Sequence, residues 1–163
     1  MAPLRFYAAG KAIGGEGTVQ SVSTLLTNRG WQCALDWTTV IVHKPYLDHL
    51  TANQSAAQAM KEAVASSDLV VLVPEANVFE ALVEAGIAIA FGAQVAVLGA
   101  ARQSIFWCLP DVHLVDGLDE LALLADEIED RRRPKERRRT SGRSEPRGNL
   151  RVYRGPDEPE PSR

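Results

Sequence analysis

Two glutamates, Glu80 and Glu84, lie four positions apart in the apolar segment FEALVEAGIAIAFG. This spacing places both carboxylates on one face of a helix. Apolar neighbours desolvate a carboxylate and raise its pKa, whereas the helix N-terminus favours the anion. Glu84 could therefore stay ionised and act as a nucleophile, with Glu80 contacting the substrate; an exposed helix position is the alternative for Glu84.

A second group of candidate residues surrounds a glycine-rich segment, GKAIGGEGT, which begins at Gly10. Tyr7 comes just before it, and Lys11 and Gly14 lie within it. The backbone N–H groups of such a loop, leading into a helix N-terminus, can bind a phosphate or the edge of a base. The segment matches neither the P-loop nor the dinucleotide fingerprint, so a purely structural turn is an equal alternative.

The hydrophobic pattern predicts the elements that would position these residues. We expect strands at 4–9, 31–37, 69–73, 94–98 and 112–115, and helices at about 18–28, 53–66, 80–91 and 118–128. The run LVVLV at 69–73 is typical of a central strand buried on both faces. Alternating strands and helices predict an α/β fold with a doubly wound, flavodoxin- or Rossmann-like parallel sheet. In such a sheet ligands bind beyond the carboxyl ends of the strands.

Charge divides the chain into two parts. Residues 1–128 contain 6 Lys and Arg against 14 Asp and Glu, whereas residues 129–163 contain 12 against 7. The second part has too few apolar residues to fold alone, so we expect one domain at 1–128 and a disordered charged tail at 129–163. The acidic domain would repel nucleic acid, and any nucleic-acid or protein contact of this kind would use the basic tail.

Three further sequence features bear on location and metals. The first twelve residues contain neither a signal peptide nor an apolar stretch of spanning length, so we expect a cytoplasmic protein without membrane contact. Cys33 and Cys108 lack CxxC spacing and are expected to be small core residues. His43, His49 and His113 lack metal-ligand spacing and are expected on the surface or in loops.

Four segments resemble the nucleoside 2-deoxyribosyltransferase-like superfamily, which includes nucleoside and nucleotide N-glycosidases. They cover most of residues 4–125: FYAAG, LLTNRGWQCALDWT, SSDLVVLVPEANVFEALVEAGIAIAFGAQVAVLG and SIFWCLPDVHLVDGLDEL. The resemblance implies that Tyr7 and Glu84 are catalytic, with Glu84 as the nucleophile of an ExG step. It implies cleavage or transfer at the N-glycosidic bond of a (deoxy)nucleoside or nucleotide through a glycosyl-enzyme, without a metal or cofactor.

The sequence departs from the family pattern at two places. Met60 stands where many members carry an aspartate that contacts the sugar, and Phe79 stands in a stretch that is usually glycine-rich. We expect the bulk of Phe79 to narrow or reshape the pocket. Asn77 or Asp36 could replace the missing sugar contact, and Lys11 could bind a 5′-phosphate.

Two other functions remain open from the sequence. One is a catalytically idle module that binds a nucleotide or another small molecule and signals through the tail. The other is a hydrolase that acts on a different ribosyl compound, such as a dinucleotide. We also expect a homo-oligomer, because members of the resembled family commonly complete their sites across a subunit interface. The helix carrying Ile87, Ile89 and Phe91 is also apolar on more than one face.

Overall fold

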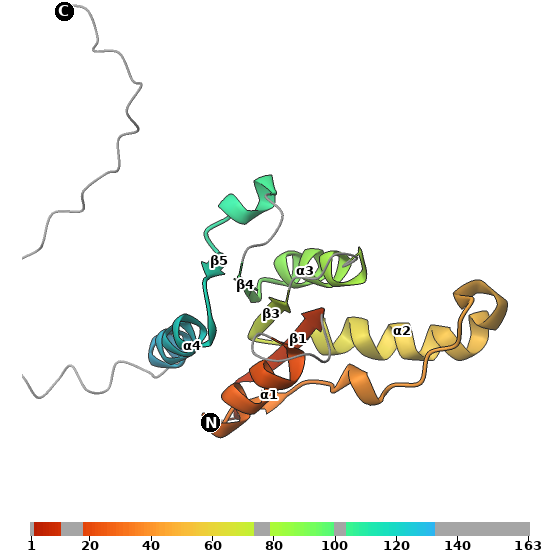
Figure 1. Ribbon diagram of the computed structural model, residues 1–163, viewed down its shortest axis with the longest axis horizontal. Helices are drawn as coiled ribbons and strands as arrows, with labels where there is room; N and C mark the ends of the chain where they lie inside the picture. The colour runs from red at the N-terminus through yellow and green to blue at the C-terminus, as the bar shows by residue number, and fades with distance from the viewer. Residues whose placement is uncertain (1, 11–17, 74–78, 100–103, 133–163) are drawn as a thin grey trace, which may run out of the picture. The chain divides into compact units, whose positions relative to one another are not determined.

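The computed structural model describes residues 2–10, 18–73, 79–99 and 104–132 (Figure 1). Their elements, in chain order, are β1 (Arg5–Gly10), α1 (Val19–Asn28), β2 (Gln32–Cys33), η1 (Trp37–Thr39), η2 (Tyr46–His49), α2 (Leu50–Ala65), β3 (Leu69–Val73), α3 (Phe79–Phe91), β4 (Gln94–Leu98), η3 (Ile105–Cys108), β5 (Val112–Val115) and α4 (Leu118–Arg132). The η elements are single turns of 3₁₀ helix. Most of the glycine-rich segment and the expected tail from residue 133 onward lie outside the described residues.

The five strands form one parallel sheet in the order β2-β1-β3-β4-β5, which confirms the predicted fold class. Every residue of β3 is buried, as its continuous apolar run predicts. Strand order reverses between β1 and β3, because the chain leaves β1 toward β2 and later returns to β1's other side. In doubly wound sheets this reversal opens a crevice at the carboxyl ends of the two strands.

The alternation of side chains along β1 divides the core into two layers. Phe6 and Ala8 belong to the layer under α1 and α4, and Tyr7 and Ala9 belong to the layer under α2 and α3. Figure 1 shows these two pairs of helices on opposite sides of the strands. The period-2 geometry of the strand therefore directs the Tyr7 ring toward α3.

Gly10 ends β1 in a position that only glycine fits. Its φ is +110°, and a Cβ atom there would lie 1.9 Å from the carbonyl oxygen of Val73 on the neighbouring β3. The absence of a side chain thus allows the two central strands to stay paired up to the mouth of the crevice.

The second strand is shorter than predicted from the sequence. Pairing covers Gln32–Cys33, and Ala34 adds one further bond to the carbonyl of Phe6. Beyond that point the Asp36 carboxylate accepts hydrogen bonds from the backbone N–H and the hydroxyl of Thr38, which turns the chain into η1. A local side-chain bond thus ends a strand that the apolar pattern alone would continue.

Helix α1 starts where its capping residue predicts, whereas α2 and α4 extend beyond the bounds predicted from the sequence. Thr18 caps α1 by accepting a bond from the Ser21 N–H at 3.3 Å, as expected. Helix α2 begins three residues before the predicted 53, and α4 continues to Arg132 rather than about 128. Arg132 contacts the Asp68 carboxylate at 3.5 Å, which connects the last turn of α4 to the start of β3. Among the helices described, none is long and apolar enough to cross a membrane.

Candidate active site

A hydrogen bond between two distant residues marks the candidate site. The Tyr7 hydroxyl donates to Oε1 of Glu84 at 2.5 Å. Tyr7 is fully buried on β1, and Glu84 lies in the second turn of α3 with a half-buried side chain. Both residues were predicted from the sequence, and the structure brings them together.

The surroundings shift the pKa of both groups. Burial raises the pKa of Glu84, and the neighbouring Glu80 carboxylate raises it further, whereas the hydrogen bond from Tyr7 opposes the rise. Burial and the Glu84 carboxylate raise the pKa of Tyr7, so the phenol keeps its proton and serves as a donor. The pair is thus a desolvated carboxylate held in one orientation by a neutral phenol.

Glu84 faces a cavity of about 570 Å³, a size suited to a small organic ligand. The cavity lies over the carboxyl end of β1, where the strand order reverses, as expected for this kind of sheet. Its lining combines apolar and polar side chains from several elements: Gly10, Trp37, Val42, Lys44, Tyr46, Asn53, Ala57, Met60, Glu80, Ala81 and Glu84.

Trp37 supplies an aromatic wall that sequence reasoning missed. Its indole N–H donates to the carbonyl of Ala8 at 2.8 Å, which fixes the ring against β1. Because this donor is already used, Trp37 offers the cavity only its apolar ring. Its position at the end of a predicted strand is a weak signal at most, since an aromatic residue there can equally belong to the core.

Asn53 holds one rim of the cavity, and this residue was also missed. Its amide nitrogen donates to the carbonyls of His43 and Tyr46 at 2.7 and 3.0 Å, and its oxygen accepts from the His43 N–H at 2.9 Å. One side chain on α2 thereby fastens the segment 43–46, which we call the strap. The strap carries Lys44, whose ammonium lies 5.4 Å from the centre of the Tyr46 ring.

The other residues predicted for substrate contact have three different outcomes. Gly10 and Glu80 line the cavity, as expected, and Glu80 accepts a long hydrogen bond of 3.5 Å from the Tyr46 hydroxyl. Asp36 is exposed and caps η1 through Thr38, and it is not among the residues that line the cavity. The remaining three lie outside the described residues: Lys11, Gly14 and Asn77.

Met60 and Phe79 behave differently from each other. Met60 lines the cavity from α2, so the wall is apolar where the resembled family usually has an acid. Phe79 is 76% exposed and does not line the cavity, so the expectation that its bulk narrows the pocket is wrong. As the first residue of α3, it lies off the face that carries Glu80 and Glu84.

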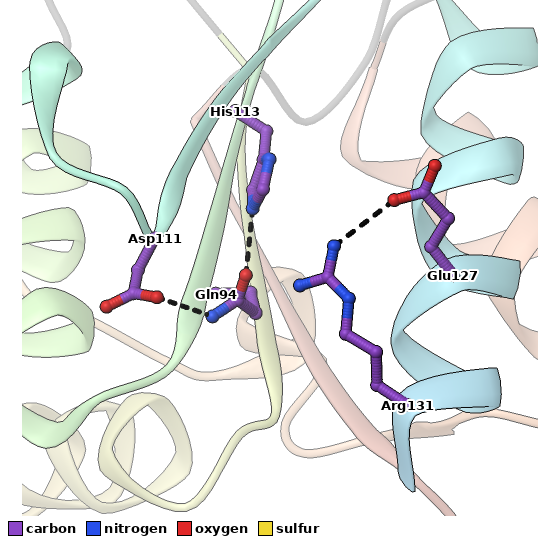
Figure 2. Close-up of polar contacts among 5 residues, drawn as sticks. All are labelled: Gln94, Asp111, His113, Glu127 and Arg131. Atoms are coloured by element: carbon purple, nitrogen blue, oxygen red, sulfur yellow. Dashed lines mark hydrogen bonds and ion pairs between the residues drawn. The ribbon is translucent and has the colours of Figure 1, made fainter. Parts of the chain in front are cut away.

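A separate polar cluster involves His113, which lies in β5 rather than in a loop (Figure 2). Its Nε2 lies 2.8 Å from Oε1 of Gln94, whose amide donates to Asp111 at 3.0 Å. Burial and the charge of Arg131 on α4 lower the pKa of His113. Arg131 pairs with Glu127, with 3.2 Å between Nη2 and Oε2 (Figure 2). Gln94 begins β4, so the cluster lies at the amino edge of the sheet and supports packing.

The cysteines and the remaining histidines form no second chemical site. Cys33 is half-buried against the core, as expected, but Cys108 is exposed, so its core assignment is wrong. The rings of the exposed residues His43 and His49 lie 5.2 Å apart in a tilted arrangement. The described residues contain no group of three or more His, Cys, Asp and Glu that could hold a metal ion.

Comparison with known proteins shows a shared fold. No family model and no curated protein matches the sequence. Among solved structures, the chain is similar to the CMP N-glycosidase BcmB of Clostridium botulinum, with a TM-score of 0.50 and 15% sequence identity. The match covers 75% of this chain and 98% of that protein. The match shows that this chain and that protein share a fold.

Proposed function

We propose that this chain is an N-glycosidase-like enzyme that cleaves or transfers the N-glycosidic bond of a (deoxy)nucleoside or nucleotide. The observation that carries the proposal is the Tyr7–Glu84 hydrogen bond at the wall of a cavity of suitable size. The fold shared with a CMP N-glycosidase supports the same chemistry.

Glu84 is the nucleophile in this proposal. One of its oxygens attacks C1′ of the sugar while the C1′–N bond breaks, and the bonding electrons leave with the base. An oxocarbenium-like transition state is stabilised by the same carboxylate that then forms the glycosyl-enzyme ester. Water, or a second base in a transferase, then attacks C1′ as the ester bond breaks and the Glu84 carboxylate is restored.

Tyr7 orients the nucleophile rather than reacting itself. Its raised pKa keeps the phenol protonated, so that the hydrogen bond to Oε1 persists at neutral pH. That bond leaves the second oxygen of Glu84 to attack the sugar. The fixed Trp37 ring beside the crevice provides an apolar surface suited to one face of a planar base.

The test incubates the protein with a panel of nucleosides, 5′-nucleotides and NAD and measures the released free base by chromatography. We expect the wild-type chain to act on at least one of them and Glu84→Ala to lose about a thousandfold or more of that rate. Glu62→Ala is the matched control, because Glu62 is an exposed carboxylate on α2 outside the cavity. Addition of a second free base distinguishes transfer from hydrolysis.

Two results would contradict the proposal. One is a wild-type protein that releases no base from any compound in the panel. The other is a Glu84→Ala variant that retains the wild-type rate. Intact-mass measurement after rapid quenching should also show the mass of a glycosyl group on the wild-type chain and none on Glu84→Ala.

A further inference from the structure

We infer that Glu80 binds the vicinal 2′ and 3′ hydroxyls of the sugar, which makes ribosides, rather than 2′-deoxyribosides, the preferred substrate class. This inference rests on the proposed function of the same cavity, and it adds a specificity-determining residue to it.

The first step is to establish which polar groups of the lining remain available to a ligand. The indole N–H of Trp37 is used by Ala8, and both amide protons of Asn53 are used by the strap. Asn53 also accepts a bond from the strap, so its role is positioning. The Lys44 ammonium is a donor only.

The second step concerns acceptors. A sugar hydroxyl that donates its proton needs an oxygen on the protein, and Met60 offers none. Within the described lining, the side-chain carboxylates are those of Glu80 and Glu84. Glu84 is committed to Tyr7 and to C1′ in the proposed reaction, which leaves Glu80 as the charged acceptor for the other positions of the ring, beside the neutral Tyr46 hydroxyl.

The third step is geometric. Glu80 lies one helical turn before Glu84 on the same face of α3, a spacing that sets Cβ atoms about 5–6 Å apart. This spacing allows a sugar whose C1′ meets Glu84 to place C2′ and C3′ within reach of the Glu80 carboxylate. Two vicinal hydroxyls present two parallel donors, and the two oxygens of one carboxylate match them with charge-assisted hydrogen bonds.

The fourth step is that Glu80 has a support. The Tyr46 hydroxyl lies 3.5 Å from Oε1 of Glu80, and the strap that carries Tyr46 is fastened by Asn53. Within the described residues, Oε2 of Glu80 has no hydrogen-bond partner. The carboxylate is thus held by one bond at Oε1, and each of its two oxygens keeps a lone pair for a sugar hydroxyl.

The test measures the ratio of activities on matched ribo- and 2′-deoxyribonucleotides of the same base. Because the two bonds differ in intrinsic lability, the informative quantity is the change in this ratio between variants. We expect Glu80→Ala to lower the ribo-to-deoxy ratio of kcat/KM by about tenfold or more, the effect of losing a hydrogen bond to a charged group. Glu80→Gln keeps one acceptor, so its ribo-to-deoxy ratio should lie between those of the wild type and Glu80→Ala. The ratio of Glu62→Ala should match that of the wild type.

A binding measurement separates this inference from the proposed reaction. Ribose 5-phosphate and 2-deoxyribose 5-phosphate are titrated calorimetrically into the full chain, and we expect Glu80→Ala to weaken the first by at least about fivefold more than the second. Two results would overturn the role of Glu80 and leave the proposed function standing. One is a Glu80→Ala variant that binds both sugars more weakly by the same factor, and the other is an active Glu80→Ala variant with the wild-type ribo-to-deoxy ratio of kcat/KM. If the folded wild-type chain bound neither sugar and released no base, both the inference and the proposed function would fall.

Discussion

The phenol of Tyr7 meets the carboxylate of Glu84 at 2.5 Å across a sequence separation of 77 residues. This distance is in the range of short, charge-assisted O–H···O⁻ bonds. It connects β1 to α3 at the place where the strand order of the sheet reverses. The bond holds the Glu84 carboxylate in one orientation, and the burial around it raises the pKa of Glu84.

Tyr7→Phe should move the acid limb of the activity profile to higher pH. The hydrogen bond from Tyr7 lowers the pKa of Glu84, so its removal lets burial and Glu80 raise that pKa further. In the proposed reaction Glu84 must be ionised, so at mildly acidic pH we expect a loss of about ten- to a hundredfold in kcat/KM. A pH–rate profile of the variant checks this prediction. A loss of kcat/KM by the same factor at every pH would contradict it and would show that Tyr7 only orients the Glu84 carboxylate.

Glu84→Gln should stabilise the protein at neutral pH while it removes activity. The folded-state pKa of Glu84 is raised, so the folded chain holds this proton more tightly than the unfolded chain. Stability from this group is present below the ordinary glutamate pKa and is lost as pH rises through the raised value. We expect Tm of the variant to exceed that of the wild type by about 2–5 °C at pH 8 and to converge at pH 4.

Scanning calorimetry at several pH values measures this difference. Glu62→Gln is the matched control, because the same chemical change on an exposed position should give a small, pH-independent shift. A Tm difference between Glu84→Gln and the wild type that grew toward acidic pH would have the reverse of the expected pH dependence. It would contradict a raised pKa of Glu84 from desolvation.

Gly10→Ala should destabilise the protein far more than Gly30→Ala. Both glycines have positive φ, +110° and +83°, but a Cβ at Gly10 would lie 1.9 Å from the Val73 oxygen, whereas nothing lies within 4 Å at Gly30. We expect about 1 kcal/mol of destabilisation at Gly30 from backbone strain and at least about 3 kcal/mol at Gly10 from strain plus displacement of β3. Urea unfolding measures both; equal losses would show that the steric contact is unimportant.

Two truncations should locate the end of the folded domain. A chain ending at residue 133 keeps the Arg132–Asp68 contact and should melt within about 1 °C of the full chain, since the removed segment has few apolar residues. A chain ending at residue 128 loses the last turn of α4 with that contact and with the Arg131–Glu127 pair, and it should melt several degrees lower. Equal Tm values for the two truncations would place the functional end of the helix earlier.

The exposed apolar face of α3 should mediate self-association. Ile87 and Ile89 pack against the core, whereas Leu82, Val83 and Phe91 are 46%, 50% and 62% exposed. We expect an oligomer by light scattering, and Val83→Glu should shift it toward monomer. The matched control is Leu123→Glu, a 64% exposed leucine on α4. A wild-type chain that is monomeric at working concentration would contradict the prediction.

Local sequence patterns predicted much of the fold because they encode local preferences. The β-branched run 69–73 and the segment 94–98 specify strands, and Thr18 specifies a helix start through its own hydroxyl. The Asp36–Thr38 bonds that end β2 early were not predicted, since an apolar pattern does not show when a polar side chain will compete with the sheet.

The candidate site required the tertiary structure to a greater extent. The pair Tyr7 and Glu84 was suggested by spacing and resemblance, because each lies in a strongly patterned element. The cavity wall formed by Trp37, Lys44 and Asn53 was not predicted. Trp37 and Lys44 lie in the connection between β2 and α2, whose path depends on the bond from Trp37 to β1 and on the bonds from Asn53 of α2. The sequence by itself thus pointed to Tyr7 and Glu84 as the candidate pair, and only long-range packing decided which side chains surround them.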